Sequence, residues 1–332
     1  LSQSGWNYGA CSTSQYPNAS GWGIFRTRGT DAANTDYYAY LDAINTFQNP
    51  EAVNINVFAT PGIDYINHSN LVEETIEMIE ADRADSLYVT TTPDYSMNAN
   101  TFNVTNIVQP QEAVDNLDAT GIDSNYTATY YPWVKILDDS TNRPTWVPPS
   151  VVLPGVISFN DSVAHEWFAP AGLNRGGLTD VLEAKTRLTH SERDKLYEDR
   201  VNPIATFPGQ GVVVFGQKTL QGKPSALDRV NVRRLLIALK KFIASTSRFL
   251  VFEQNTTATR NRFLNVVNPF LEDVQANSGL SAFRVVMDDT NNTPDEIDRN
   301  RLIGQIFIQP TRTAEFIVLD FVVQPTGATF PE

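Results

Sequence analysis

The alternation of apolar and polar residues divides the chain into strands and helices. Residues 53–58 (VNINVF) alternate with period two, which is typical of a half-buried strand. Asn70 is a good N-cap, and the apolar residues of the stretch 71–79 share one helical face. Residues 87–90 (LYVT) form the next apolar run. The order strand, helix, strand predicts a βαβ unit with a right-handed crossover.

The same reading gives the other elements of the chain. Further helices are expected at residues 37–47, 110–117, 191–198, 231–247 and 257–277, the last kinked by Pro269 and ending before Gly279. Further strands are expected at residues 127–136, 211–215, 249–252, 283–287, 302–308 and 315–323. The expected fold class is therefore α/β, with mixed α+β elements in the C-terminal part.

Changes in composition suggest three parts. Residues 1–35 are rich in Gly and Ser interleaved with aromatic residues, and we expect them to continue a domain that is cut at the N-terminus, because the chain opens on Leu1 rather than methionine. Residues 36–145 form the expected α/β domain. A turn-rich stretch, 138–150, leads into residues 146–332, the expected core domain with a C-terminal strand and arm.

Composition limits the classes of function. The 332 residues are 41% hydrophobic, which suits a globular protein, and the formal net charge is −13. Such acidity argues against a nucleic-acid partner, because phosphate is bound by basic surfaces. No apolar run is long enough to cross a membrane, so no membrane insertion is expected. Cys11 is the only cysteine, which excludes an intrachain disulfide.

Motifs for catalysis or metal binding are incomplete. Residues 211–219 (GVVVFGQKT) approximate a phosphate-binding loop, but Gln217 interrupts the motif and its β-branched residues favour a strand. His165 and Glu166 begin a zinc-protease motif, yet Ala169 replaces the second histidine. The acidic stretch 288–298 has proline where a calcium loop needs glycine. We therefore expect no catalytic residue, no cofactor, no metal site and no enzyme.

One enzymatic alternative stays open at this point. Asp94 and Asp123 follow predicted strands, where α/β enzymes often place their active sites. A hydrolase that uses these strand-end carboxylates is therefore the competing interpretation.

The helix expected at residues 231–247 carries an unusual number of cations for an acidic chain. Val232, Leu235 and Leu239 mark its core face. The cations predict a solvent-facing basic ridge that contacts an acidic partner; they are Arg233, Arg234, Lys240, Lys241 and Arg248. Because this ridge is separate from the core face, charge reversal at Lys240 and Lys241 is expected to leave the fold intact. An ordinary solvated helix face is the other interpretation.

Short motifs along most of the chain resemble the contractile tail sheath protein family. They follow one another in the order in which that family has them: 59–62 (ATPG), 130–133 (YYPW), 147–150 (VPPS), 169–172 (APAG), 201–204 (VNPI), 207–254 and 314–317 (AEFI). Each motif is short, and the order gives the signal its specificity. Gln217 and Gln254 depart from the residues that are common in the family, and both flank predicted strands.

The resemblance implies a structural subunit that polymerises helically around a tail tube. Contraction of the sheath then drives the tube through a host cell envelope, using the free-energy difference between two subunit arrangements. The implied partners are other sheath subunits, the tail tube protein, and the baseplate and tail terminator proteins. The implied location is the tail of the virion, after assembly in the host cytoplasm. Another kind of structural virion protein is the second alternative.

Family subunits also interlock by adding terminal strands to the sheets of their neighbours. The apolar run 315–323 is therefore expected to lie at a sheet used for subunit exchange, with the residues that follow as an arm. Its residues proposed for the interface are Glu315, Phe316, Val318, Asp320 and Val322.

Overall fold

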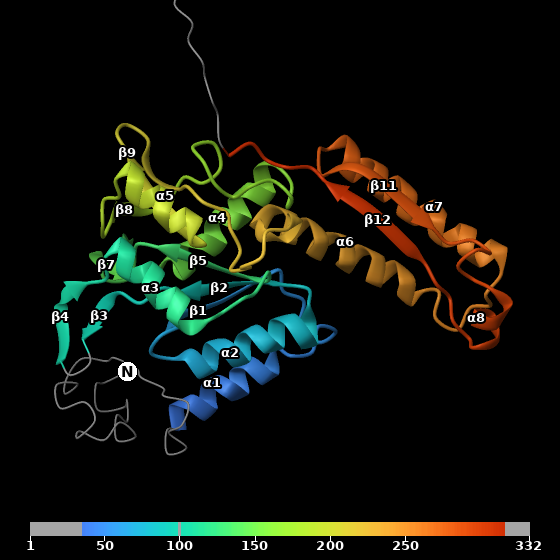
Figure 1. The fold of residues 1–332 in the computed structure, drawn as a ribbon, viewed down its shortest axis with the longest axis horizontal. Coiled ribbons are helices and arrows are strands. Elements are labelled where there is room, and N and C mark those ends of the chain that lie inside the picture. Colours follow the sequence, from blue (N-terminus) through green and yellow to red (C-terminus); the bar gives the residue numbers. More distant parts are fainter. Residues whose placement is uncertain (1–34, 99–100, 316–332) are drawn as a thin grey trace, which may run out of the picture.

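A computed structural model describes residues 35–98 and 101–315, without the side chains of residues 35–36, 96–98 and 101–106. A body of sheet and helices forms one part of the molecule, and a C-terminal unit of helices and a β-hairpin extends from it (Figure 1). The long helix α6 (Val230–Arg248) runs from the body into this unit. Within the described residues, no helix is both long and apolar enough to cross a membrane.

A five-stranded sheet forms the centre of the body. Its strands in spatial order are β1 (Val57–Asp64), β2 (Leu87–Thr91), β5 (Thr127–Tyr131), β9 (Val201–Phe207) and β10 (Gly211–Val214). The first four are parallel, and β10 returns antiparallel beside β9. Every residue of β2 and β5 is buried, as expected for parallel strands covered on both faces. Since β9 and β10 lie beyond residue 145, the sheet combines both expected parts of the chain.

Helices cover the two faces of this sheet. One face packs against α1 (Thr35–Thr46), α2 (Ser69–Glu77) with its π-helical extension η3 (Met78–Arg83), α3 (Pro110–Thr120) and α5 (His190–Glu198). The other face packs against α4 (Pro149–Val163) and α6. Side chains alternate between the two cores, so that Tyr88 and Tyr131 enter the first and Val89 and Tyr130 the second.

The remaining elements form smaller units. Strands β3 (Tyr95–Asn98) and β4 (Thr101–Ile107) make one hairpin, while β7 (Arg143–Val147), β6 (Val134–Asp138) and β8 (Val181–Ala184) make a small sheet. The short 3-10 helix η4 (Ala226–Asp228) precedes α6. In the C-terminal unit, α7 (Thr257–Ala276) and α8 (Pro294–Asp298) accompany the hairpin of β11 (Leu280–Val286) and β12 (Gln305–Pro310). A third core, with Phe263 and Val267 of α7, holds this unit together.

The predicted fold class and βαβ unit are confirmed. The pair β1–β2 is parallel with α2 between them, and α6 and α7 match the long predicted helices. Several boundaries were wrong. β1 spans Val57–Asp64 rather than the expected residues 53–58, and its register with β2 shifts between Ala59 and Asp64. His68, not Asn70, precedes α2, and the left-handed residue after α7 is Ser278 rather than a glycine.

Three further expectations were wrong because local sequence hides tertiary context. The strand expected at 127–136 is two strands, β5 and β6, which belong to different sheets, and the peptide bond between Tyr131 and Pro132 in the connection is cis. The stretch 138–150 forms β7 and begins α4 rather than remaining a loop. Residues 249–252, expected as a buried strand, form a turn in which Leu250 is buried and the other three side chains are exposed, because no strand among the described residues pairs with them. The strand expected at 315–323 lies outside the described residues, apart from Glu315.

Candidate functional site

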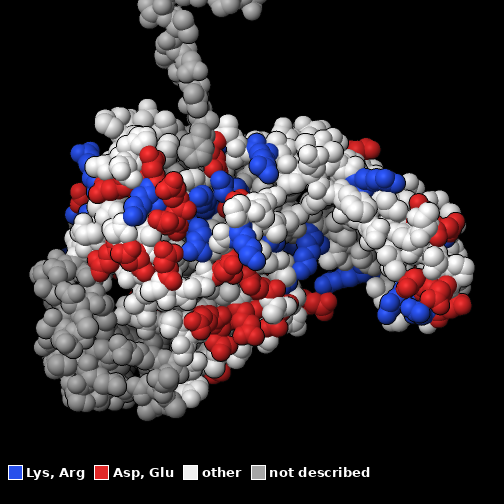
Figure 2. Space-filling model, viewed as in Figure 1, with Lys and Arg blue, Asp and Glu red and all other residues white. Residues whose placement is uncertain are grey.

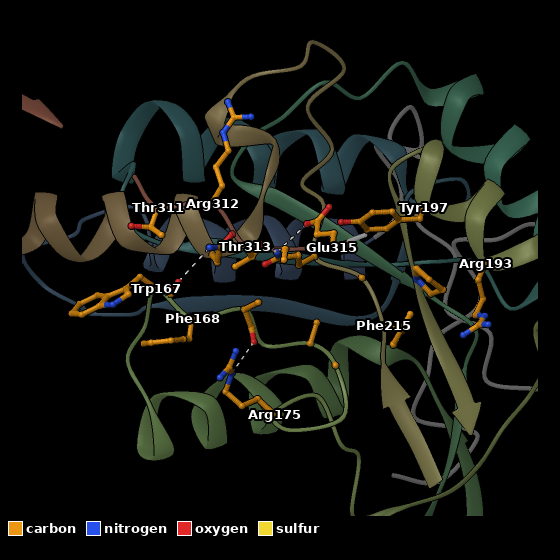
Figure 3. Close-up of a pocket in the computed structure, with 18 of the residues that line it drawn as sticks. Trp167, Phe168, Arg175, Arg193, Tyr197, Phe215, Thr311, Arg312, Thr313 and Glu315 are labelled. Carbon is orange, nitrogen blue, oxygen red and sulfur yellow. Dashed lines mark hydrogen bonds between the residues drawn. The ribbon is translucent and has the colours of Figure 1, made fainter. Parts of the chain in front are cut away.

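The last described residues, 311–315, lie against the body, and we call them the strap (Figure 3). Glu315 Oε1 accepts hydrogen bonds from Arg229 Nε at 2.7 Å and from Gln217 Nε2 at 3.0 Å. Gln217 Nε2 also donates to Thr313 Oγ1 at 2.7 Å. The strap is therefore fixed through side chains that belong to two different segments of the body.

The local fold brings these two segments together. Gln217 follows β10 and Arg229 immediately precedes α6, and the backbone N–H of Val230 donates to the Gln217 carbonyl at 2.7 Å. An isolated antiparallel bridge joins Lys218 to Arg229. The Arg229 guanidinium also pairs with Asp228 at 3.1 Å, so a contact that does not involve the strap helps to hold it in position.

Tyr197, near the end of α5, completes the contact with Glu315 (Figure 3). Burial raises the pKa of the Tyr197 phenol far above its ordinary value, and the Glu315 carboxylate raises that pKa further. The phenol thus stays protonated and neutral beside the carboxylate. The arrangement provides donors for one carboxylate and thereby attaches the strap to the body.

A cavity of about 520 Å³ lies between the strap, α5 and the loop that follows α4. Trp167, Phe168 and Phe215 contribute aromatic walls, and Arg175 and Arg193 lie at its sides (Figure 3). Figure 3 also shows Arg312 of the strap extending away from Glu315. The cavity is the junction of body, strap and C-terminal unit, because Ser278 also lines it.

The prediction that the basic ridge on α6 faces solvent is wrong for Arg233 and Arg234. Arg233 and Arg234 are only 6% and 3% exposed. The Arg233 guanidinium donates to the carbonyl of Asn125 at 3.1 Å and lies 3.9 Å from the ring centre of Tyr126. Arg234 pairs with Asp161 at 2.5 Å. Both arginines therefore serve the internal packing of α6, because the body covers the side on which they project.

The other three cations of the predicted ridge connect α6 to segments near β1 and β2. Lys241 Nζ donates to the carbonyl of Ile55 at 2.6 Å and to the side chain of Asn54 at 2.8 Å. Lys240 Nζ donates to the carbonyl of Ala84 at 3.2 Å, and Arg248 pairs with Glu51 at 3.0 Å on the surface. Figure 2 shows basic residues gathered in the hollow between the body and the C-terminal unit. Contact of these residues with a partner stays a prediction.

Of the residues predicted for the C-terminal strand, only Glu315 can be placed. It lies in the strap and bonds within its own chain, as described above. Phe316, Val318, Asp320 and Val322 lie outside the described residues. The sequence reasoning missed Gln217, Arg229 and Tyr197 as the residues that hold Glu315. Gln217 had drawn attention only as a departure from the phosphate-loop and family patterns.

The two carboxylates of the enzymatic alternative have structural partners. Asp94 follows β2 as expected, whereas the placement of Asp123 after a strand was wrong, because it lies between α3 and β5. Lys185 Nζ contacts both Asp94 oxygens at 2.6 Å, and burial raises the Asp94 pKa above its ordinary value. Asp123 Oδ1 accepts from the backbone N–H of Gly222 at 2.8 Å. Neither carboxylate faces a second catalytic group among the described residues. In the part of the chain that the structure describes, no group of three histidine, cysteine or carboxylate side chains is placed to hold a metal ion.

The segment that approximates a phosphate-binding loop is the strand β10 and the turn after it. The Lys218 N–H donates to Asn202 Oδ1 at 2.6 Å, and the Thr219 N–H donates to the Asp228 carbonyl at 3.0 Å. Backbone donors that already have partners do not bind phosphate. The interpretation as a strand is confirmed.

Comparison with protein families matches nearly the whole chain. Residues 30–220 match the phage tail sheath protein central domain, and residues 222–324 match the phage tail sheath C-terminal domain. The tail sheath protein of Enterobacteria phage T4 is 32% identical over 330 residues, covering 93% of this chain and 48% of the relative. That of Vibrio phage KVP40 is 38% identical over 226 residues, covering 67% and 33%. The chain thus spans less than half the length of these curated relatives.

Solved structures share the fold. The sheath complex of an extracellular contractile injection system, PVC, in its contracted state has a TM-score of 0.69 at 21% identity, covering 88% of this chain and 83% of the other. The contracted helical sheath of the anti-feeding prophage has a TM-score of 0.64 at 24% identity, covering 88% and 75%.

Proposed function

Because the chain belongs to the phage tail sheath protein family, we propose that it is the subunit of a contractile sheath that polymerises helically around a tail tube. In this proposal, the sheath contracts and drives the tube through the envelope of the host cell. The family is one of structural proteins, so the chain is not an enzyme, and the hydrolase alternative is wrong.

One observation supports polymerisation above the others. The hairpin β11–β12 has two outer edges, and no other strand among the described residues pairs with either. Unpaired strand edges bind further strands, because their N–H and C=O groups lack partners. The hairpin therefore suits the addition of terminal strands from neighbouring subunits. Phe307 on β12 is more than half exposed, which leaves apolar surface beside the same edge.

The strap also supports polymerisation, because it determines where the residues that follow it begin. It leaves the hairpin directly after β12 and is fixed to the body at Glu315, so the residues that follow start from a defined point. A segment whose first residue is already held in place loses less conformational entropy when it binds a neighbouring subunit than a segment without such an attachment. We propose that residues 316–332 supply a strand to a neighbouring copy.

The proposed partners are copies of the same subunit, the tail tube protein, and the baseplate and tail terminator proteins at the two ends. A structural relative is part of the anti-feeding prophage baseplate, which favours baseplate contacts for this family. The proposed location is the virion tail, after assembly in the host cytoplasm.

Electron microscopy of the whole purified protein tests the proposal. Hollow cylinders are expected, whereas discrete particles of fixed size would support another kind of structural virion protein. Truncation after Glu315 should leave the described fold and abolish the cylinders. Phe307→Glu should weaken assembly with an unchanged melting temperature, while Leu182→Glu, at a similarly exposed position on β8, serves as the matched control.

A further inference from the structure

The turn between α6 and α7 presents apolar side chains to solvent. Phe249 is 83% exposed, Val251 is 59% exposed and Phe252 is fully exposed. Apolar residues exposed singly are ordinary, but three within one four-residue turn form a patch of the kind that marks a binding surface. Nothing else in the described part of the chain covers Phe252.

The backbone at Phe252 is also in an unfavourable conformation. Its φ is +70°, in the left-handed region that costs a residue with a side chain roughly 1–2 kcal/mol. Glycine would occupy this position without that cost. A strained phenylalanine with an exposed ring gains nothing from its own chain, so a contact outside the chain explains both features together.

The cavity at the other end of α6 has a complementary shape and chemistry. Its volume of about 520 Å³ is in the range that holds compact ligands, and its walls include Trp167, Phe168 and Phe215. Aromatic walls favour an aromatic occupant, because rings pack well edge to face or offset. An aromatic side chain from another molecule therefore fits the space.

The charge of the cavity indicates an acidic occupant. Arg175, Arg193 and Arg312 line it, and none forms an ion pair within the described residues. Two carboxylates also line it, but each already has a partner, since Asp194 lies 2.8 Å from His190 and Glu315 pairs with Arg229. Arg193 lies over the rings of Phe207 and Phe215, at 5.1 and 5.4 Å, and its buried Nε has no hydrogen-bond partner there. In a chain of net charge −13, such guanidinium groups around one cavity are unusual. A carboxylate is the group that they bind best.

The exposed turn supplies such a carboxylate. Glu253 follows Phe252 directly, is exposed, and forms no ion pair within residues 35–98 and 101–315. We propose that the cavity of one subunit receives Phe252 and Glu253 of a second copy, with the Phe252 ring between the aromatic walls and the Glu253 carboxylate on Arg193.

The two surfaces cannot meet within one molecule. They lie at opposite ends of α6, whose 19 residues span about 28 Å. A contact between different surfaces of identical subunits is heterologous, and it produces an open helical array unless the rotation closes into a ring. The contact rests on the proposed function, because it requires that copies of this protein assemble with one another.

Phe252→Gly is the first test. It removes the ring and the strain, so the subunit should keep or slightly raise its melting temperature while the concentration for half-maximal cylinder formation rises about tenfold or more. Leu182→Ala removes an exposed apolar side chain elsewhere on the subunit and should leave assembly unchanged.

Charge exchange is the second test. Glu253→Arg and Arg193→Glu should each impair assembly, and the double variant should recover it. A photoreactive phenylalanine analogue at position 252 of an otherwise native protein gives a readout that does not depend on the stability of these variants. Its cross-links should map to the peptides that contain residues 167–175 or 215.

The outcomes separate the two proposals. If the native protein forms no cylinders, the proposed function fails. If the native protein forms cylinders and the Phe252→Gly protein assembles at the same concentration, or if the cross-links map away from the cavity, the contact between the turn and the cavity is refuted while the sheath function stands.

Discussion

The indole Nε1 of Trp167 donates to the carbonyl of Asn277 at 3.0 Å, and this bond joins the body to the C-terminal unit. Gly279 lies beside the same indole, where an added Cβ would approach Val274 Cγ1 to 2.6 Å and the Trp167 ring to 3.1 Å. The space beside the indole at Gly279 therefore has no room for a side chain, and this contact between the body and the C-terminal unit depends on a glycine.

Replacing this glycine should loosen the junction. Gly279→Ala is expected to lower the free energy of unfolding by roughly 1–3 kcal/mol, because the new methyl group overlaps Val274 and Trp167. Urea denaturation followed by tryptophan fluorescence measures the change. Gly155→Ala is the matched control: nothing lies within 4 Å of its added Cβ, and in the exposed middle of α4 alanine should stabilise by roughly 0.5–1 kcal/mol. Equal effects of both variants would contradict this account.

Removal of the Glu315 carboxylate should release the strap. Glu315→Ala deprives Arg229 and Gln217 of their common acceptor, and the expected loss in stability is about 1–3 kcal/mol. Limited proteolysis should cut residues 311–315 faster in the variant. Glu183→Ala, which breaks only the exposed pair with Lys135, should change stability by less than about 1 kcal/mol and leave the cutting rate unaltered. Unchanged cutting in the Glu315→Ala protein would show that other contacts hold the strap.

The adjacent lysines of α6 should respond differently to charge reversal. Lys240 is exposed and has one contact, so Lys240→Glu should fold with nearly the native melting temperature. Lys241 donates to Ile55 and Asn54 and lies 3.9 Å from Asp85, so Lys241→Glu should lower the melting temperature by several degrees. The expectation that both reversals leave the fold intact is thereby restricted to Lys240. Identical melting curves for the two variants would show that the Lys241 contacts contribute no stability.

The buried pair of Lys185 and Asp94 should behave as a structural unit. Both side chains are about nine-tenths buried, so Lys185→Met leaves a carboxylate without its ion-pair partner and should cost roughly 3–5 kcal/mol. Adding Asp94→Asn should restore much of that loss, as a thermal melt of the single and double variants would reveal. If Asp94→Asn has the same effect in the presence and absence of Lys185, the two groups do not interact.

Periodicity predicted the long helices well, because α6 and α7 carry apolar stripes that extend over several turns. It failed for Arg233 and Arg234, which occupy the polar side of the α6 pattern but are covered by Asn125, Tyr126 and Asp161. A helix pattern shows which residues share a face and not whether another segment covers the polar one. Burial of a paired arginine therefore has no local signal.

The prediction of a buried strand at residues 249–252 was wrong because a partner that the sequence pattern requires is missing. Residues 249–252 (FLVF) have high β-propensity, but a strand requires a partner strand, and none of the described strands pairs with them where α6 ends. The cavity was also out of reach, since its walls come from residues around 167, 193, 215 and 312, which are far apart in the sequence. Arginines without acidic partners mark this cavity, but the sequence does not show which arginines lack a partner. Only the positions of the side chains in space identify them.

The uneven burial of α6 means that a small rotation where the helix begins would produce a large displacement where it ends. Residues up to Leu239 are mostly buried, some against the body and some against the C-terminal unit, while the last two turns are less buried. A rotation of about 10° at the root of a helix about 28 Å long would displace its far end by about 5 Å, and the contacts of Lys240, Lys241 and Arg248 with the body would have to yield for it to occur. Small changes in packing around Arg234 and Asp161 would thus become displacements of nearly one helical turn at Phe252, on the scale at which neighbouring subunits in a lattice must be repositioned.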